Sequence, residues 1–153
     1  MAFNAGDDLT AQLLNDTFPD TKFNRANTVG SATNTSYTAT LTGGGVAAGT
    51  SFTAPLSGKV TIHFATAGFN SGANDNKTAV RVGTGATPGG GSTIYAATDD
   101  DMILFTGAAT YGIAGFTEVS GLTPGTVYNA QMQHRVSGGT GSWLFKRIKV
   151  VPN

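Results

Sequence analysis

The chain has 153 residues and no cysteine, and its nine Lys and Arg residues balance nine Asp and Glu residues, so that only 12% of the residues are charged. These values exclude a disulfide framework and a thiolate zinc site. They also argue against a nucleic-acid-binding protein, which needs an excess of positive charge. Glycine contributes 22 residues, about twice its usual share, and this composition favours turns and strands over helices.

The sequence contains no sign of membrane association or export. No apolar run approaches the roughly 18 residues of a membrane-spanning helix. The first residues have neither the basic nor the apolar region of a signal peptide. We therefore expect synthesis in a cytoplasm, no membrane partner and no nucleic-acid partner.

Residues 6–18 are the one segment with a convincing helical pattern. Asp7 can cap such a helix, and Pro19 ends it. The apolar side chains form two pairs at a spacing of four residues: Leu9 with Leu13, and Leu14 with Phe18. A helix of about three turns is marginal in isolation, so its apolar stripe must dock either on its own domain or on other chains. We interpret residues 1–20 as a helical anchor segment, and residues 21–35, which are polar and lack apolar periodicity, as a linker.

Residues 36–153 have the pattern of a single β domain. Alternating polar and apolar residues between Gly-rich turns predict strands at 36–41, 50–53, 59–66, 77–82, 93–97, 102–106, 111–119, 126–136 and 143–152. The last two strands are long, and the Gly-bearing loop between them predicts a β-hairpin on which the shorter strands pack. About eight or nine strands at this spacing predict an all-β jelly-roll sandwich, with an immunoglobulin-like sandwich as the second choice.

The last two predicted strands also carry candidate interface residues. Residues 126–136 are predicted to carry Tyr128, Ala130, Met132 and Val136 on one face, together with His134. In the final strand apolar residues occupy both faces, with Leu144, Ile148 and Val150 opposing Trp143, Phe145 and Val151. A strand that is apolar on both faces is covered on both sides, by the core and by a neighbouring subunit or loop. We therefore expect an anchor or subunit interface formed by Leu9, Leu13, Leu14, Phe18, Tyr128, Trp143 and Phe145.

No group of residues has the pattern of an active site. The Gly-rich segment 83–89 lacks the Lys and Ser/Thr of a phosphate loop, and Glu118, the only glutamate, leaves few candidates for a catalytic carboxylate pair. The acidic run 99–101 lacks the spacing of a calcium loop and is predicted to be a solvated turn. His63 and His134 have no cysteine or well-placed carboxylate beside them, and His134 is predicted to be a hydrogen-bonded core or interface histidine. We expect no enzymatic activity, no cofactor and no bound metal.

Several aromatic residues allow a second kind of function. Tyr95 and Tyr111, with Tyr128 and Trp143, are the residue types that form a platform for a sugar ring. Core packing or subunit contact explains such residues more often. We keep Tyr95 and Tyr111 as possible ligand-facing residues.

Two features resemble known families. Residues 5–15 (AGDDLTAQLLN) resemble the short N-terminal segment of virion structural proteins from tailed bacteriophages. Residues 52–62, with 122–128 and 150–152, are similar to the strand pattern of trimeric jelly rolls of the tumour necrosis factor-like kind. Together the resemblances imply a homotrimeric capsid decoration protein of the cement or head-fibre type, or a small tail protein, located in the virion with the major capsid protein or another virion protein as its partner. The alternative is a minor tail or lectin-like module that binds host-surface carbohydrate.

Overall fold

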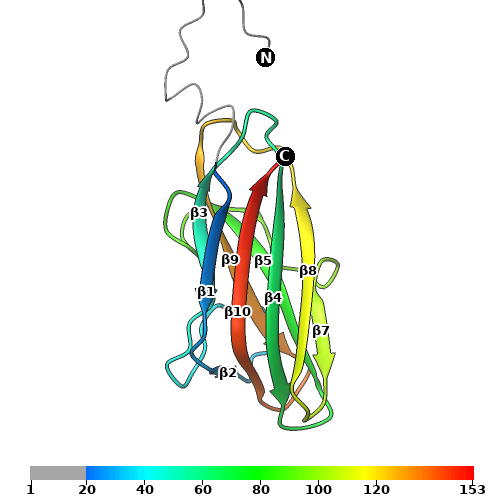
Figure 1. Cartoon of the computed structure of the whole chain (residues 1–153). Coiled ribbons are helices and arrows are strands. Elements are labelled where there is room, and N and C mark those ends of the chain that lie inside the picture. The colour runs from blue at the N-terminus through cyan, green and yellow to red at the C-terminus, as the bar shows by residue number, and fades with distance from the viewer. Residues whose placement is uncertain (1–19) are drawn as a thin grey trace, which may run out of the picture.

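A computed structural model describes residues 20–153. In this range ten strands form two antiparallel sheets that pack face to face, and there is no helix (Figure 1). The strands are β1 (Lys22–Ala26), β2 (Gly30–Ala32), β3 (Gly49–Thr53), β4 (Val60–Asn70), β5 (Asp75–Thr84), β6 (Thr93–Tyr95), β7 (Ile103–Thr106), β8 (Tyr111–Val119), β9 (Val127–Val136) and β10 (Gly141–Pro152). The described residues therefore contain no helix that is long and apolar enough to cross a membrane. The expected N-terminal helix lies outside the described residues.

Each early strand pairs with a late one. Sheet A has the order β1-β10-β4-β8, with β2 also paired to β10, and sheet B has the order β3-β9-β5-β6, with β7 also paired to β5. The pairing is that of one long hairpin folded over into two layers. Its antiparallel pairs are β1 with β10, β3 with β9, β4 with β8, and β5 with β7. This pairing is that of a jelly roll. The predicted all-β jelly-roll sandwich is confirmed, with ten strands in place of eight or nine.

The predicted C-terminal hairpin is wrong. β9 lies in sheet B and β10 in sheet A, so that the Gly-rich loop between them crosses from one sheet to the other (Figure 1). Alternation in a sequence identifies a strand and its two faces but carries no information about its partner. The partners of these strands are β3 and β5 for β9, and β1, β2 and β4 for β10.

The core fills the space between the two sheets. The inward residues of β4 are Val60, Ile62 and Phe64, as predicted, and all three are buried. The shared face predicted for residues 126–136 is confirmed in β9, and it points into the core, since all five of its residues are buried: Tyr128, Ala130, Met132, His134 and Val136. Ile148 and Val150 of β10 complete the facing layer.

A β-bulge in β10 divides two aromatic residues that were expected on the same face. The register with β4 shifts between Trp143 and Lys146, so that both of these side chains are buried while Phe145 points outward. The Nζ of Lys146 donates hydrogen bonds to the carbonyl oxygens of Thr28, at 2.7 Å, and Trp143, at 3.2 Å. Burial lowers the pKa of Lys146. An extra residue in one strand reverses the faces beyond it, which simple alternation does not anticipate.

Polar side chains are paired inside the core around Trp143. Its Nε1 donates a hydrogen bond of 3.0 Å to the Oγ1 of Thr78, which also lies 3.0 Å from the Nδ1 of His134. The His134 and Trp143 rings are in contact, with centroids 4.8 Å apart. Burial, and to a smaller degree the charge of Lys146, lowers the pKa of His134 to about 3, so the imidazole is neutral. The prediction of a hydrogen-bonded core histidine is confirmed.

Residues 21–35 differ from the expected linker. They contain β1 and β2, which both pair with β10 in sheet A. The sequence of β1 (KFNRA) places Phe23 on the solvent side and only Ala26 is buried, so its pattern contains no apolar stripe to signal a strand. Residues 36–41, expected to be a strand, form only isolated bridges through Thr38 and Thr40.

Candidate functional site

The structure places the predicted interface residues in different environments. Tyr128 and Trp143 are buried in the core of their own chain, so their side chains are not available at the surface. Phe145 is 50% exposed on the outer side of sheet A. Leu9, Leu13, Leu14 and Phe18 lie outside the described residues.

The possible ligand-facing residues Tyr95 and Tyr111 do not share a site. The Tyr95 hydroxyl contacts the Asp101 carboxylate and lies 3.0 Å from the Oγ1 of Thr117. Thr117 lies in β8, and Tyr111 is the first residue of that strand. Their separation of six residues corresponds to about 20 Å along an extended strand. Tyr111 is exposed beside a hollow of ≈ 270 Å³ lined by β7 and β8. The two tyrosines therefore cannot stack on one small sugar.

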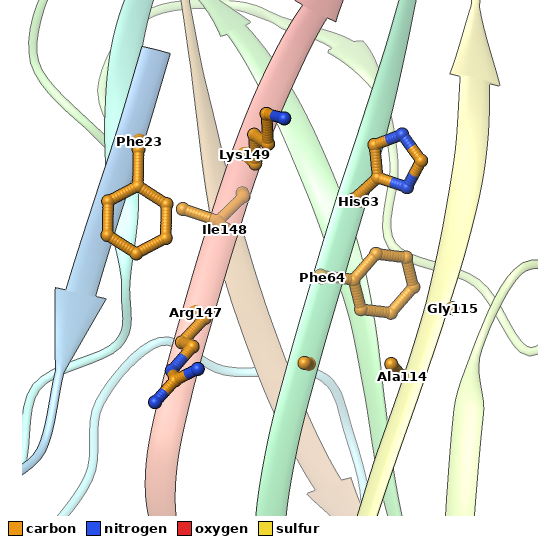
Figure 2. A pocket seen from close by; sticks show the side chains of 9 residues that line it. Phe23, His63, Phe64, Ala114, Gly115, Arg147, Ile148 and Lys149 are labelled. Atoms are coloured by element: carbon orange, nitrogen blue, oxygen red, sulfur yellow. The ribbon is translucent and has the colours of Figure 1, made fainter.

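The outer side of sheet A, called here the A face, is the most distinctive surface of the described residues. Strand register aligns its side chains in rows: Phe23, Lys149, His63 and Phe116 lie across β1, β10, β4 and β8. The next row contains Arg25, Arg147, Ala65 and Ala114. Phe145, Ala67 and Gly112 follow beyond the second row and line a hollow together. Figure 2 shows part of this arrangement, with Phe23 on β1, Arg147 and Lys149 on β10, and His63 on β4.

Three large aromatic side chains on the A face are open to solvent. Phe23 is 59%, Phe116 63% and Phe145 50% exposed. Between them the small residues Ala65 and Ala114 form the floor of two shallow hollows of ≈ 150 and ≈ 350 Å³. Apolar protrusions around a shallow floor are typical of a surface that another chain covers, since exposed apolar residues on a monomer are usually scattered.

The A face also carries charged side chains, in which Arg25, Arg147 and Lys149 outnumber Glu118, the carboxylate that points outward from β8 two residues beyond Phe116. Arg25 of β1 lies directly opposite Arg147 of β10, and Lys149 lies opposite Phe23 in the adjacent row. Like charges directly opposite each other in a sheet are destabilising. Within residues 20–153 none of these three cations forms an ion pair. This side of sheet A would therefore be stabilised by an acidic and apolar partner.

The outer side of sheet B is, by contrast, largely covered by the chain's own loops. Ala79 and Asn129 both point outward from sheet B, yet they are 1% and 0% exposed. The Gly-rich loop 85–92 covers Asn129, whose Nδ2 contacts the carbonyl oxygens of Gly83, Thr84 and Gly85 at 3.1–3.2 Å. Arg81 holds the same loop by donating to the carbonyl oxygens of Gly90 and Gly91.

A charged cluster holds a second stretch of chain over sheet B. Asp99 accepts hydrogen bonds from Arg135, Lys77 (2.8 Å) and the Tyr37 hydroxyl (2.9 Å), and the Arg135 guanidinium lies 5.4 Å from the centre of the Tyr37 ring. The hydrogen bonds from Arg135 and Lys77 hold the pKa of the Asp99 carboxyl well below its usual range. The acidic run 99–101 is thus an exposed turn, as predicted, and its first carboxylate, which is 40% exposed, also holds the turn in place through these hydrogen bonds.

The described residues offer no grouping for metal chemistry. Within residues 20–153, three or more His, Asp or Glu side chains nowhere come close enough to hold a metal ion. The A face is a recognition surface by its chemistry, with aromatic, cationic and small residues and no nucleophile beside a base. Of the three exposed phenylalanines, the sequence analysis identified Phe145 as an interface residue but not Phe23 or Phe116. The alternation in residues 112–118, which places Gly112, Ala114, Phe116 and Glu118 on one side of the strand, could have indicated that Phe116 points outward.

Comparison with known proteins gives a fold likeness and no family. No known protein family matches the chain, and no curated protein matches its sequence. Among solved structures the chain is similar to the Eiger TNF structure from S. frugiperda, with 6% sequence identity, a TM-score of 0.45, and coverage of 87% of this chain and 92% of that chain. The assignment of a jelly roll rests on the strand pairing described above, and the likeness is to a TNF-like β-sandwich.

Proposed function

We propose that this chain is a virion structural protein, a capsid decoration protein that binds the outer surface of a bacteriophage head and forms a homotrimer there. The observation that carries the proposal is the A face, where three exposed phenylalanines surround a shallow apolar floor. The phage assignment is supported by the resemblance of residues 5–15 to the N-terminal segment of phage virion proteins.

Burial of the A face supplies a favourable free energy for association. Complete burial of a phenylalanine side chain is worth about 1.5–3 kcal/mol, and these three are already half-buried, so covering each contributes roughly 1 kcal/mol. The floor residues and the pairing of Arg25, Arg147 and Lys149 with acidic groups add to this. The sum fits an assembly whose copies are held together partly by their common attachment to a shell.

The test is incorporation into particles. Phe116→Ser removes the most exposed aromatic residue of the A face, and we expect it to weaken binding to particles by about fivefold, measured as copies per particle below saturation, because roughly 1 kcal/mol is lost and 1.4 kcal/mol is a factor of ten in binding. Ile94→Ser is the matched control, because Ile94 is a half-exposed apolar residue of β6 in sheet B. Normal loading of the Phe116→Ser protein, with a normal thermal unfolding curve, would contradict the proposal.

A second arm tests the proposed anchor. Deletion of residues 1–20 leaves every strand of the sandwich intact. We expect the truncated protein to keep its β-sheet circular dichroism spectrum and to be absent from particles. Loading at the level of the full chain would show that the anchor lies elsewhere.

Carbohydrate recognition is the second candidate, and the exposed position of Tyr111 beside its hollow favours it. A lectin-like module would bind one sugar class reproducibly on a glycan array and lose that binding on Tyr111→Ala. Tyr95→Ala should then have no effect, because Tyr95 lies in a different part of the molecule. Absence of binding to all sugars removes this alternative.

A further inference from the structure

We infer that residues 1–19 of the free chain dock on the A face of their own sandwich and cover it until the segment is engaged elsewhere. The inference rests on the proposed function, in which the same segment binds the shell and the A face meets other copies. Binding of the segment to a shell would then uncover the A face, so that copies associate on the particle and stay apart in solution.

Charge identifies the segment as a fitting occupant. Residues 1–19 contain Asp7, Asp8 and Asp16 and no Lys, Arg or Glu. The rest of the chain holds all nine Lys and Arg residues against six acidic residues, an excess of three positive charges. Those cations include Arg25, Arg147 and Lys149 of the A face, which no carboxylate of residues 20–153 neutralises. The three acidic side chains of the segment are opposite in sign to these cations, which outnumber Glu118, the carboxylate that β8 places on the same face.

The apolar residues match as well. The segment contains Phe3, Leu9, Leu13, Leu14 and Phe18, and the A face offers exposed phenylalanines at its margins with alanine between them. A largely polar surface such as the loops over sheet B would leave these five side chains in water. Docking on the A face buries apolar groups of both partners at once.

The point of attachment makes docking within one chain feasible. The described chain begins two residues before β1, which is an edge strand of sheet A. Four strands span about 15 Å between the outermost strand axes, whereas nineteen residues reach about 28 Å as a helix and about 60 Å when extended. A tethered segment also binds at a high effective concentration, which favours its own face over that of another copy.

Thiol labelling of the full chain tests the inference, because the natural sequence contains no cysteine. Ala114→Cys places one thiol on the floor of the A face, where Ala114 is exposed within residues 20–153 (Figure 2). Ala96→Cys is the matched control, an exposed alanine just after β6 of sheet B. The rate of maleimide addition is measured by mass spectrometry at several protein concentrations. Each thiol is compared in the natural background and with Asp7→Lys, Asp8→Lys and Asp16→Lys combined.

We expect the triple charge reversal to accelerate labelling of Ala114→Cys by about tenfold, as for a segment docked roughly nine-tenths of the time, and to leave Ala96→Cys unchanged. Adding Arg147→Glu and Lys149→Glu to the reversed segment should restore protection, because the charges then match again. An Ala114→Cys rate that is independent of the segment's charge overturns the inference.

Concentration separates this inference from the proposed function. Protection by the chain's own segment is independent of protein concentration. Protection that grows with concentration and ignores the segment's charge means that a second copy covers the A face, which overturns the inference and supports the proposed function. Segment-dependent protection together with normal particle loading of Phe116→Ser supports the inference and contradicts the proposed function.

Discussion

At the scale of single residues, the core owes its specificity to a few polar side chains with defined partners. Thr78 lies between the indole of Trp143 and the imidazole of His134, and the Nζ of Lys146 is held by two backbone carbonyls. The Nε2 of His134 has no partner within residues 20–153. Buried polar groups of this kind fix one arrangement of the core, and they make its stability sensitive to pH.

We predict that the unfolding free energy falls by about 2 kcal/mol between pH 7 and pH 5 because of His134. Burial lowers its pKa to about 3 in the folded chain, whereas the unfolded value is about 6.5. Below pH 6.5 the unfolded chain therefore binds a proton that the folded chain excludes, so the stability present above pH 6.5 is lost as the pH falls towards 3. Urea denaturation at each pH measures the effect.

Substitution identifies the responsible histidine. His134→Gln keeps a polar partner for Thr78 but cannot titrate, so its stability should vary much less between pH 7 and pH 5. His63→Gln is the control, because His63 is exposed on the A face and should retain the pH dependence of the unaltered protein. If the His134→Gln protein shows the same slope as the unaltered protein, His134 is not the titrating group.

At the scale of elements, strand positions could be predicted from sequence more successfully than strand partners. The alternation located β4, β8 and β9, and for β4 it also identified the residues that face the core, because one face of that strand is buried. Partners remained out of reach, since the jelly-roll pairing joins strands such as β4 and β8 that are far apart in sequence. β1 was not predicted because its large apolar residue, Phe23, points outward and leaves no apolar stripe. The bulge in β10 places Phe145 on the opposite face from Trp143.

The Gly-rich loop over sheet B shows how one side chain organises an element. Gly85, Gly89 and Gly91 have positive φ angles, which other residues rarely adopt. The buried Asn129 amide donates to loop carbonyls, and its Oδ1 accepts a 3.0 Å hydrogen bond from the Gly89 N–H. The loop is thus a fixed cover of sheet B.

We predict that Asn129→Ala destabilises the protein by about 2–3 kcal/mol, because it leaves several buried backbone groups without partners. Backbone hydrogen exchange in residues 85–91 should accelerate more than exchange in the sheets. Gln133→Ala is the control, since Gln133 also points outward from β9 and its side chain makes no hydrogen bond with another residue of the range 20–153. Equal stability of the two variants would show that the amide does not hold the loop.

At the scale of the whole molecule, the two layers of the sandwich differ in what covers them. Sheet B is largely covered by loops of the same chain, whereas sheet A presents exposed phenylalanines, a small-residue floor and three cations that pair with no carboxylate of residues 20–153. The candidate site could not be predicted from sequence, because its rows of side chains depend on the register of β1, β10, β4 and β8. β1 and β10 are neighbours in the sheet but lie near opposite ends of the chain. The central claim is that other protein chains cover this side of sheet A when the protein is assembled.

A high-resolution cryo-electron microscopy map of particles carrying the protein tests this claim most directly. We expect Phe23, Phe116 and Phe145 to contact another chain, acidic groups to lie beside Arg25, Arg147 and Lys149, and the Gly-rich loop over sheet B to face solvent. A map in which the A face is bare and neighbouring chains meet at sheet B would contradict it.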